Sequence, residues 1–341
     1  MNASTSKVES PWRTQRVKRF SVKRWGWTGG AFLALMIVVC AGSLPWALER
    51  ADANGTRRFE AGDSDVALVS PTWMMSEKER EELRTRLPES DESRWRYALG
   101  TDRLGRDFLL RCLMGGVISL GVGIAAAATS VLVGTLYGIT AGMSGGKIDA
   151  FMMRAVDVMY GLPSVLLVVL IAVAADGLRE RMRWESGSST NTAMNLGVMF
   201  IAIGGVSWLT MARVIRGQVL SLKSQAFMEA CTVMGMGRWR EYRKHVLPSL
   251  VGPIVVYATL TVPTAILMES FLSYLGIGVR EPIPSWGNLA SSGLSELNMV
   301  KSRWWLIVSP CLLLALTLVS LSLVGEAMRA KFDVRKGATR G

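Results

Sequence analysis

Six blocks of about 20 apolar residues constrain this sequence more than any other feature. They cover approximately residues 28–48, 116–141, 155–175, 196–212, 251–275 and 304–324. A helix of about 20 residues crosses a bilayer core of about 30 Å, and backbone amides in lipid must be hydrogen-bonded within their own segment. The sequence therefore predicts an all-α, polytopic membrane protein with six transmembrane helices.

The placement of Lys and Arg predicts how these helices are oriented. The net charge is +12, and the basic residues lie beside the apolar blocks. Cytoplasmic loops of membrane proteins are enriched in Lys and Arg. The basic segments are residues 1–27, 213–249 and 327–341, and six crossings put all three on one side. We therefore expect both termini in the cytoplasm, with the positive charge near anionic membrane lipid rather than nucleic acid.

The remaining boundaries follow from the same pattern. Residues 28–48 are expected to form the first transmembrane helix, because the block is longer than the core of a secretory signal peptide and no small-residue cleavage site follows it. Residues 49–115 then form an extended external loop, with a short solvated helix at 76–86. Residues 116–326 form a core with the other five helices. Several tryptophans fall near block ends, as interfacial aromatics do: Trp27, Trp46, Trp208, Trp304 and Trp305.

No catalytic or metal-binding set of residues stands out in the sequence. It has one His, and its four cysteines form no CxxC pair, so we expect no metal site. A phosphate-binding loop is excluded around Gly146, because Ala141 stands where its first glycine should be and Ile148 where Ser or Thr should be. No Ser-His-Asp or Cys-His set is present either. The chain is therefore expected to be neither an enzyme nor an ATP-binding subunit.

Two acidic residues, Asp157 and Glu269, lie in or near apolar blocks. An acidic residue within a membrane is a functional candidate, because burying its charge is costly. Both are therefore candidates for a transport pathway. In the simpler interpretation, Asp157 is solvated or paired with Arg154 at the cytoplasmic edge, and Glu269 pairs with a partner subunit. If these acids carry protons, the chain is a proton-coupled secondary transporter. A membrane scaffold without transport activity is a third alternative.

The loop 213–249 has the pattern of two short helices joined at glycine. Residues 227–234 favour a helix, Gly235 interrupts it, and residues 238–246 can resume a helix before Pro248. The first of these helices carries apolar side chains outside the membrane, where they need a protein partner to bury them. We therefore expect this loop to bind another protein in the cytoplasm.

This loop resembles the EAA loop of bacterial ABC importer permeases, in which E-A-A is followed at fixed spacing by G and then by L-P. The matching residues are Glu229, Ala230, Gly235, His245, Leu247 and Pro248. Cys231 stands in place of the second alanine. The H-x-L-P form is similar to that of the dipeptide and oligopeptide branch of the family, in which Asn often stands where this chain has Ser249.

Further motifs of the same branch follow in the family's order. An element before the second block looks like its L-G-T-D-x-x-G-R-D motif, with Gly100, Thr101, Asp102, Gly105, Arg106 and Asp107. Trp286 lies in an element that resembles P-S-W-G-x, and residues 145–157 and 325–335 resemble its G-G-x-x-D turn and its closing segment. Together the motifs cover about residues 95–335. On these motifs the chain is identified as a member of the C-type permease branch, the inner-membrane component of a binding-protein-dependent transport system.

The resemblance implies a type I ABC importer permease fold in the bacterial plasma (inner) membrane. It implies a second homologous permease subunit, two cytoplasmic ATPase subunits that bind ATP and Mg, and an extracytoplasmic solute-binding protein. This chain itself is expected to bind no cofactor. The EAA loop would couple the ATPases to the membrane helices. The residues of the external motif and Trp286 are candidates for an external gate, although a turn and a helix start would explain them as well. Short peptides are the expected cargo, with nickel or another solute as the alternative.

Overall fold

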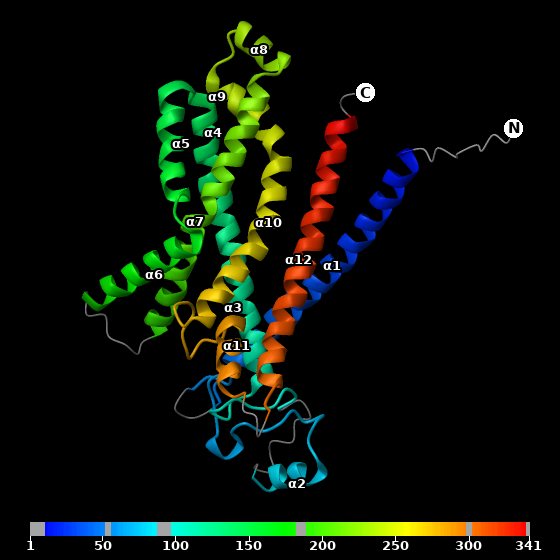
Figure 1. Ribbon diagram of the computed structural model, residues 1–341, viewed down its shortest axis with the longest axis vertical. Helices are drawn as coiled ribbons and strands as arrows, with labels where there is room; N and C mark the ends of the chain where they lie inside the picture. Colours follow the sequence, from blue (N-terminus) through cyan, green and yellow to red (C-terminus); the bar gives the residue numbers. More distant parts are fainter. Residues whose placement is uncertain (1–10, 52–55, 87–96, 182–188, 298–301, 339–341) are drawn as a thin grey trace, which may run out of the picture.

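The structure is a computed structural model that describes residues 11–51, 56–86, 97–181, 189–297 and 302–338. Within these ranges every regular element is a helix, and three isolated β-bridges are the only extended pairings. Figure 1 shows long helices running along the long axis of the molecule. The two described chain ends lie at the same end as α8 (Ala226–Val233), called here the α8 end. The opposite end, with α2 (Glu77–Arg86) and α11 (Trp286–Ser295), is the α11 end.

Five helical segments are long and apolar enough to cross a membrane. They are Trp25–Leu48 in α1 (Pro11–Leu48); Phe108–Ser144 in α3 (Phe108–Thr129), η3 (Ser130–Gly134) and α4 (Thr135–Ser144); Gly197–Lys223 in α7 (Ser189–Lys223); Trp239–Tyr274, mostly α10 (Leu247–Tyr274); and Trp305–Phe332 in α12 (Trp305–Ala338). The prediction of an all-helical, polytopic membrane protein is confirmed, with five or six candidate spans.

The remaining expected span, at 155–175, is not one straight helix. The chain forms α5 (Gly146–Tyr160) and α6 (Ser164–Arg181), and this pair is bent by 86° at the break between them. Pro163 accounts for the break, because proline disfavours helical backbone at the residue before it and lacks the N–H that would continue the helix. The two helices diverge clearly in Figure 1.

Several helices, α3 and α7 among them, extend beyond the apolar blocks. Helix α3 begins at Phe108 rather than at Gly116, because the Asp107 side chain accepts a hydrogen bond from the Leu110 backbone N–H and caps it (3.2 Å). Helix α7 continues to Lys223, whose ammonium group donates to the Gly142 carbonyl oxygen (3.3 Å) at the end of α4. The segment between α7 and α10 is therefore shorter than the loop expected at 213–249.

Glycines let α4 and its π-helical lead-in η3 pack closely on α7. Gly134, Gly138 and Gly142 are spaced four apart, so they lie on one helix face. A methyl group at Gly138 would lie 2.5 Å from the Ala212 carbonyl oxygen, and one at Gly142 would lie 2.8 Å from the Val219 side chain. Small residues permit such close approach between membrane helices. The position of α7, and of the loop that follows it, depends on this contact.

Helix α3 lies between two apolar cores. Toward one side it packs with α7 and α10 through residues such as Val122, Ile203 and Leu272. Toward the other side, Leu120 packs with α1, α12 and the buried ring of Trp286. Residues 56–86 and 97–107 form a lobe at the α11 end, which includes the expected solvated helix, observed as α2.

The glycine contact gives the first prediction. Gly138→Ala should destabilise the protein by about 1–3 kcal/mol, since the added methyl group meets backbone atoms that cannot rotate away. Gly121→Ala is the matched control in the neighbouring helix α3, because nothing lies within 4 Å of a methyl group there. It should stabilise by up to about 1 kcal/mol through helix propensity. Denaturant unfolding of the detergent-solubilised variants measures both values, and equal stabilities would contradict the packing described.

Candidate functional site

The EAA segment, defined here as residues 224–248, lies between α7 and α10. It consists of α8, the short helix α9 (Arg238–Glu241) and the π-helical turn η4 (Tyr242–Val246), which runs directly into α10. Gly235 lies between α8 and α9 with φ +69°, a left-handed conformation that favours glycine. The expectation of two short helices joined at glycine is therefore confirmed.

One face of this segment is fixed to the helix bundle. Met228 of α8 and Val246 of η4 are buried in a cluster with Ile139, Ile215 and Leu250, which belong to α4, α7 and α10. Leu247 is partly buried against the same cluster. The segment is therefore seated on three helices at once.

Several large apolar side chains of the segment are not covered by the described part of the chain. Val233 is 87% exposed and Trp239 is 72% exposed, while Met234 and Phe227 are also exposed. The motif residues Glu229 and Ala230 are exposed too, and the ring of His245 lies 6.3 Å from that of Phe227. Contiguous exposed apolar side chains are typical of a protein interaction site. Figure 1 shows α8 and α9 projecting at the end of the molecule.

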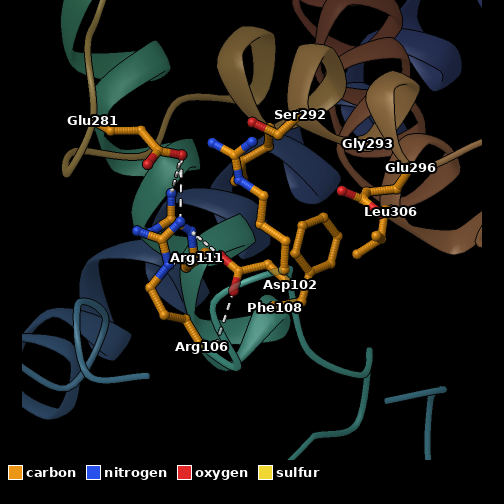
Figure 2. Close-up of a pocket in the computed structure, with 11 residues that line it drawn as sticks. Asp102, Arg106, Phe108, Arg111, Glu281, Ser292, Gly293, Glu296 and Leu306 are labelled. Carbon is orange, nitrogen blue, oxygen red and sulfur yellow. Dashed lines mark hydrogen bonds and ion pairs between the residues drawn. The ribbon is translucent and has the colours of Figure 1, made fainter. Parts of the chain in front are cut away.

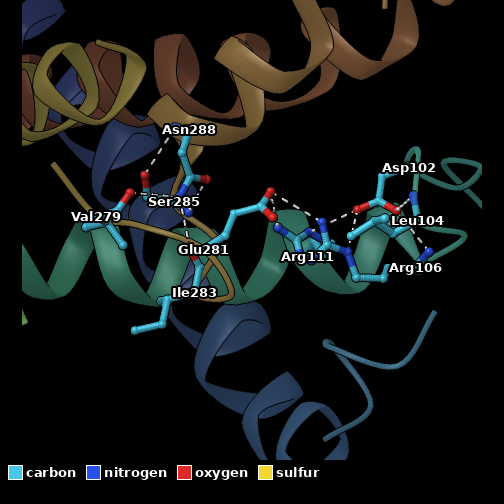
Figure 3. A network of polar contacts seen from close by, with 9 residues as sticks. All are labelled: Asp102, Leu104, Arg106, Arg111, Val279, Glu281, Ile283, Ser285 and Asn288. Atoms are coloured by element: carbon cyan, nitrogen blue, oxygen red, sulfur yellow. Dashed lines mark hydrogen bonds and ion pairs between the residues drawn. The ribbon is translucent and has the colours of Figure 1, made fainter. Parts of the chain in front are cut away.

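A second cluster of functional candidates lies at the α11 end, where four charged side chains meet (Figures 2 and 3). This external ion cluster consists of Asp102, Arg106, Arg111 and Glu281. The Arg106 Nε donates to the Asp102 carboxylate (2.6 Å), and its Nη2 donates to Glu281 (3.3 Å). Arg111 lies 3.6 Å from both carboxylates and is 1% exposed. Buried charges of this kind are stable only when paired.

The backbone around Asp102 is shaped to hold its carboxylate in place. One carboxylate oxygen accepts hydrogen bonds from the backbone N–H groups of Leu104 and Arg106 (2.9 and 3.0 Å). Gly105 has φ +71°, and a methyl group there would overlap the Asp63 carbonyl oxygen. Thr101 is buried, and its hydroxyl accepts from the Val69 N–H (2.8 Å). Gly100 also has positive φ. The expected external-gate residues between Gly100 and Asp107 thus form one folded turn, whereas Trp286 lies in α11.

The cavity beside the cluster is small. It has a volume of about 10 Å³ and lies between the cluster and α11, with Phe108, Leu289 and Ser292 on its walls (Figure 2). A volume of that size holds about one water molecule at most. The cluster joins three segments of the chain, and the cavity beside it is too small for a peptide.

Trp286 and Glu269 lie deeper in the same half of the molecule. The Trp286 indole N–H donates to the Cys112 carbonyl oxygen (3.0 Å), and its ring is buried against Gly116. The Glu269 carboxylate is fully buried and accepts hydrogen bonds from hydroxyl groups of α10 and α3. The donors are Ser119 (2.8 Å), Ser270 (3.2 Å) and Ser273 (2.7 Å).

Asp157, in contrast, is exposed on α5. Its carboxylate accepts a hydrogen bond from Arg213 of α7 (2.7 Å), and that guanidinium lies 3.9 Å from the centre of the Tyr160 ring. The expectation that Asp157 is solvated fits its exposure, while the cation that pairs with it is Arg213 of another helix rather than Arg154. The sequence alone indicates only neighbours on the same helix, such as Arg154, which is three residues before Asp157.

Comparison with known proteins assigns the family. The family model described as "Binding-protein-dependent transport system inner membrane component" matches residues 134–337. This chain belongs to that family. The predictions of an inner-membrane location and of a permease component rather than an enzyme are confirmed. Membership of this family favours a permease over the two alternatives, a proton-coupled secondary transporter and a scaffold without transport activity.

Individual relatives agree with the family model. The permease is 42% identical to the oligopeptide transport system permease protein OppC of Haemophilus influenzae, over 70% of each chain. It is 38% identical to the dipeptide transport system permease protein DppC of Bacillus subtilis, over 69% of this chain and 67% of that one. It is 31% identical to the di/tripeptide permease protein DppC of Pseudomonas aeruginosa, over 90% and 88%.

A solved structure shares the fold. A chain of the MetNI methionine ABC transporter, in inward-facing conformations, aligns with a TM-score of 0.51 at 15% identity. The alignment covers 66% of this permease and 97% of that chain. The permease therefore has the fold of an ABC importer permease.

Two members of the external ion cluster, Arg111 and Glu281, were not among the sequence candidates. Arg111 was assigned to a polar loop, and Glu281 lies 175 positions along the chain from its partner Arg106. The sequence did contain an indication of this role for Arg111. Apolar residues follow it directly, and a charge at the start of a membrane span requires a partner.

The external ion cluster gives the second prediction. Asp102→Asn should destabilise the permease by about 3–5 kcal/mol, because it leaves the buried Arg106 and Arg111 with Glu281 alone of the two carboxylates that they share. Asp157→Asn removes a carboxylate of the same type from an exposed ion pair with an Arg, so it should cost no more than about 1 kcal/mol. Denaturant unfolding in detergent compares the two variants. Similar losses at both positions would show that the external cluster contributes no more than a surface ion pair.

Proposed function

We propose that this permease is one of two homologous subunits that together form a translocation path for short peptides. Two cytoplasmic ATPase subunits, which hold ATP and Mg, would drive the cycle, and an extracytoplasmic solute-binding protein would deliver the peptide. The cargo assignment is supported by the relatives, whose printed names are those of oligopeptide, dipeptide and di/tripeptide permeases. Nickel or another solute is the alternative cargo within the family.

The proposed topology has six crossings with both termini in the cytoplasm. Its support is the course of the chain in Figure 1: α4 ends at the α8 end, whereas α7 starts toward the α11 end. The chain must therefore travel between the two ends through α5 and α6, so the bent pair counts as a crossing. Basic residues in the EAA segment favour the α8 end as the cytoplasmic end.

One observation supports a coupling role for the EAA segment. Its exposed apolar side chains lie on a segment that is packed against α4, α7 and α10. In the proposed cycle, Phe227, Val233 and Met234 would insert into a groove of one ATPase subunit. The motif residues Glu229 and Ala230 would lie on the docked face, while Gly235, His245, Leu247 and Pro248 shape the segment. Closure of the ATPases on ATP would then move the segment and the helices joined to it as rigid bodies.

We propose that the residues of the external end move together as one unit when the ATPases close. The external ion cluster joins the turn at 100–107, the start of α3 and the loop after α10. Trp286 and Glu269 join α10, α3 and α11 directly below it. Rather than forming the pathway wall themselves, these residues would hold the helix ends that open and close it. Asp157 is exposed on α5 and remains the better candidate for contact with solute.

A cargo experiment tests the proposal as a whole. A strain that lacks the gene for this permease should lose uptake of labelled dipeptides and tripeptides, and a plasmid copy should restore it. The same strain should keep its uptake of labelled nickel. Loss of nickel uptake with peptide uptake intact would transfer the assignment to the metal cargo and leave the permease role unchanged.

The docking role gives the third prediction. Val233→Asp places a charge in the proposed interface, so the amount of ATPase that co-purifies with the tagged permease should fall at least about tenfold, which corresponds to about 1.4 kcal/mol. Leu297→Asp is the control, because Leu297 is also an exposed apolar residue but lies at the α11 end. It should leave co-purification unchanged. Undiminished co-purification of the Val233 variant would exclude this face as the docking surface.

Glu269 gives the fourth prediction. Glu269→Gln keeps hydrogen bonds with the serine hydroxyls, since an amide both accepts and donates, so peptide uptake should stay within about twofold of the native level. Glu269→Leu leaves the buried hydroxyls without an acceptor, at a cost of about 1–3 kcal/mol for each unsatisfied group, and should lower the amount of folded protein. Uptake measured per folded permease compares them. A Gln variant that folds normally but transports nothing would instead make Glu269 part of the pathway.

A further inference from the structure

The external lobe presents an aromatic side chain beside the end of a membrane helix. Trp73 is 62% exposed, and the neighbouring Met74 side chain is exposed as well. The ring of Trp73 lies edge-on to that of Trp304, with 6.2 Å between the ring centres. Trp304 directly precedes α12, the most apolar of the candidate spans. A segment far away in the sequence therefore meets the start of a span through two tryptophans.

Trp304 begins an exposed stripe that runs down α12. Its carbonyl oxygen accepts a hydrogen bond from the Val308 N–H (3.0 Å), so it belongs to the first turn of the helix. The exposed large apolar residues of this helix follow at helical spacing, on one face: Val308, Leu312, Leu316 and Val319. In a protein of the inner membrane, an apolar stripe of this length on a spanning helix faces acyl chains. Trp304 is then at the level of the lipid headgroups, where tryptophan is enriched.

The turn that carries Trp73 is held firmly in the lobe. The Met74 N–H donates to the Pro71 carbonyl oxygen (2.8 Å), and the Arg80 side chain donates to the Thr72 carbonyl oxygen (3.1 Å). Pro71 and Met75, on either side, are buried. Trp73 and Met74 are therefore directed outward by a fixed backbone, and their exposure is a property of the folded lobe.

We infer that Trp73 and Met74 insert into the membrane interface at the α11 end, and that the external lobe rests on the phospholipid surface there. The contact between Trp73 and Trp304 makes the pair continuous with the lipid-facing stripe of α12. The course of the chain agrees with this orientation: α2, which follows the Trp73 turn and begins at Glu77, lies at the end of the lobe farthest from the long helices (Figure 1).

The interfacial position has a consequence for the lobe. Tryptophan combines a large apolar ring with one N–H donor, which suits the boundary between acyl chains and headgroups. The turn at 100–107 belongs to the same lobe, since Thr101 bonds to Val66 and Val69 next to the Trp73 turn. Insertion of Trp73 would therefore set the height of the external ion cluster relative to the bilayer.

Photo-crosslinking in nanodiscs tests this inference on the assembled transporter. Benzoyl-phenylalanine replaces Trp73 in one variant and Met74 in a second, so that the result does not depend on one substitution. The nanodiscs contain phosphatidylethanolamine and phosphatidylglycerol, and the binding protein is added to half of each sample. Leu312 on the α12 stripe is the lipid-facing reference, and Lys78, exposed on α2, is the water-facing reference.

The expected result is a phospholipid adduct at positions 73, 74 and 312, identified by its mass, and none at position 78. Addition of the binding protein should leave the adduct at position 73 unchanged. An adduct with the binding protein or with another subunit at position 73 would overturn the inference and make this turn a protein contact. A lack of any adduct at positions 73 and 74, with lipid captured at 312, would overturn it as well. None of these outcomes depends on the cargo of the transporter.

Discussion

The fixed length of α10 is the constraint on which both functional ends of this permease depend. Its 28 residues span about 42 Å, and it is joined to other helices at each end. At the α8 end, Leu250 packs with the EAA segment, while Glu269 bonds to Ser119 of α3 near the other end. Pro253 and Pro263 lie between these joints, each without the N–H that would complete the helix ladder. Any bend of α10 is therefore concentrated between two rigid attachments.

The elements predicted well from sequence are those whose signals are local. A run of about 20 apolar residues specifies a spanning helix without reference to the rest of the chain, and α8, α9 and their Gly235 joint follow from helix formers and one left-handed position. The bent pair α5 and α6 was partly visible in the same way, because Pro163 marks the bend. The size of that bend was not predictable, since no local signal in the sequence specifies the angle between two helices.

The polar joints were not predictable, because their partners are distant in sequence. Glu269 was a pathway candidate on the general ground that membrane acids are functional. Its acceptor role toward Ser119 depends on a residue 150 positions away, on another helix. The same holds for Arg106 and Glu281. A charge in an apolar block signals that a partner exists, but only the three-dimensional arrangement identifies it.

The two ends of the permease differ in their chemistry: paired polar groups are buried at one end, and apolar side chains are exposed at the other. At the α11 end, charged and hydroxyl groups are buried against one another within the chain, and the low dielectric makes such a joint costly to open once formed. At the α8 end, apolar side chains remain exposed on a seated segment, so their burial needs another protein. Because its charges are paired within the chain, we expect this joint to stay closed while the helices attached to it move. An unsatisfied surface, in contrast, gains stability only through a partner. Motion would therefore enter the permease at the EAA segment and reach the external end as displacement of an intact unit.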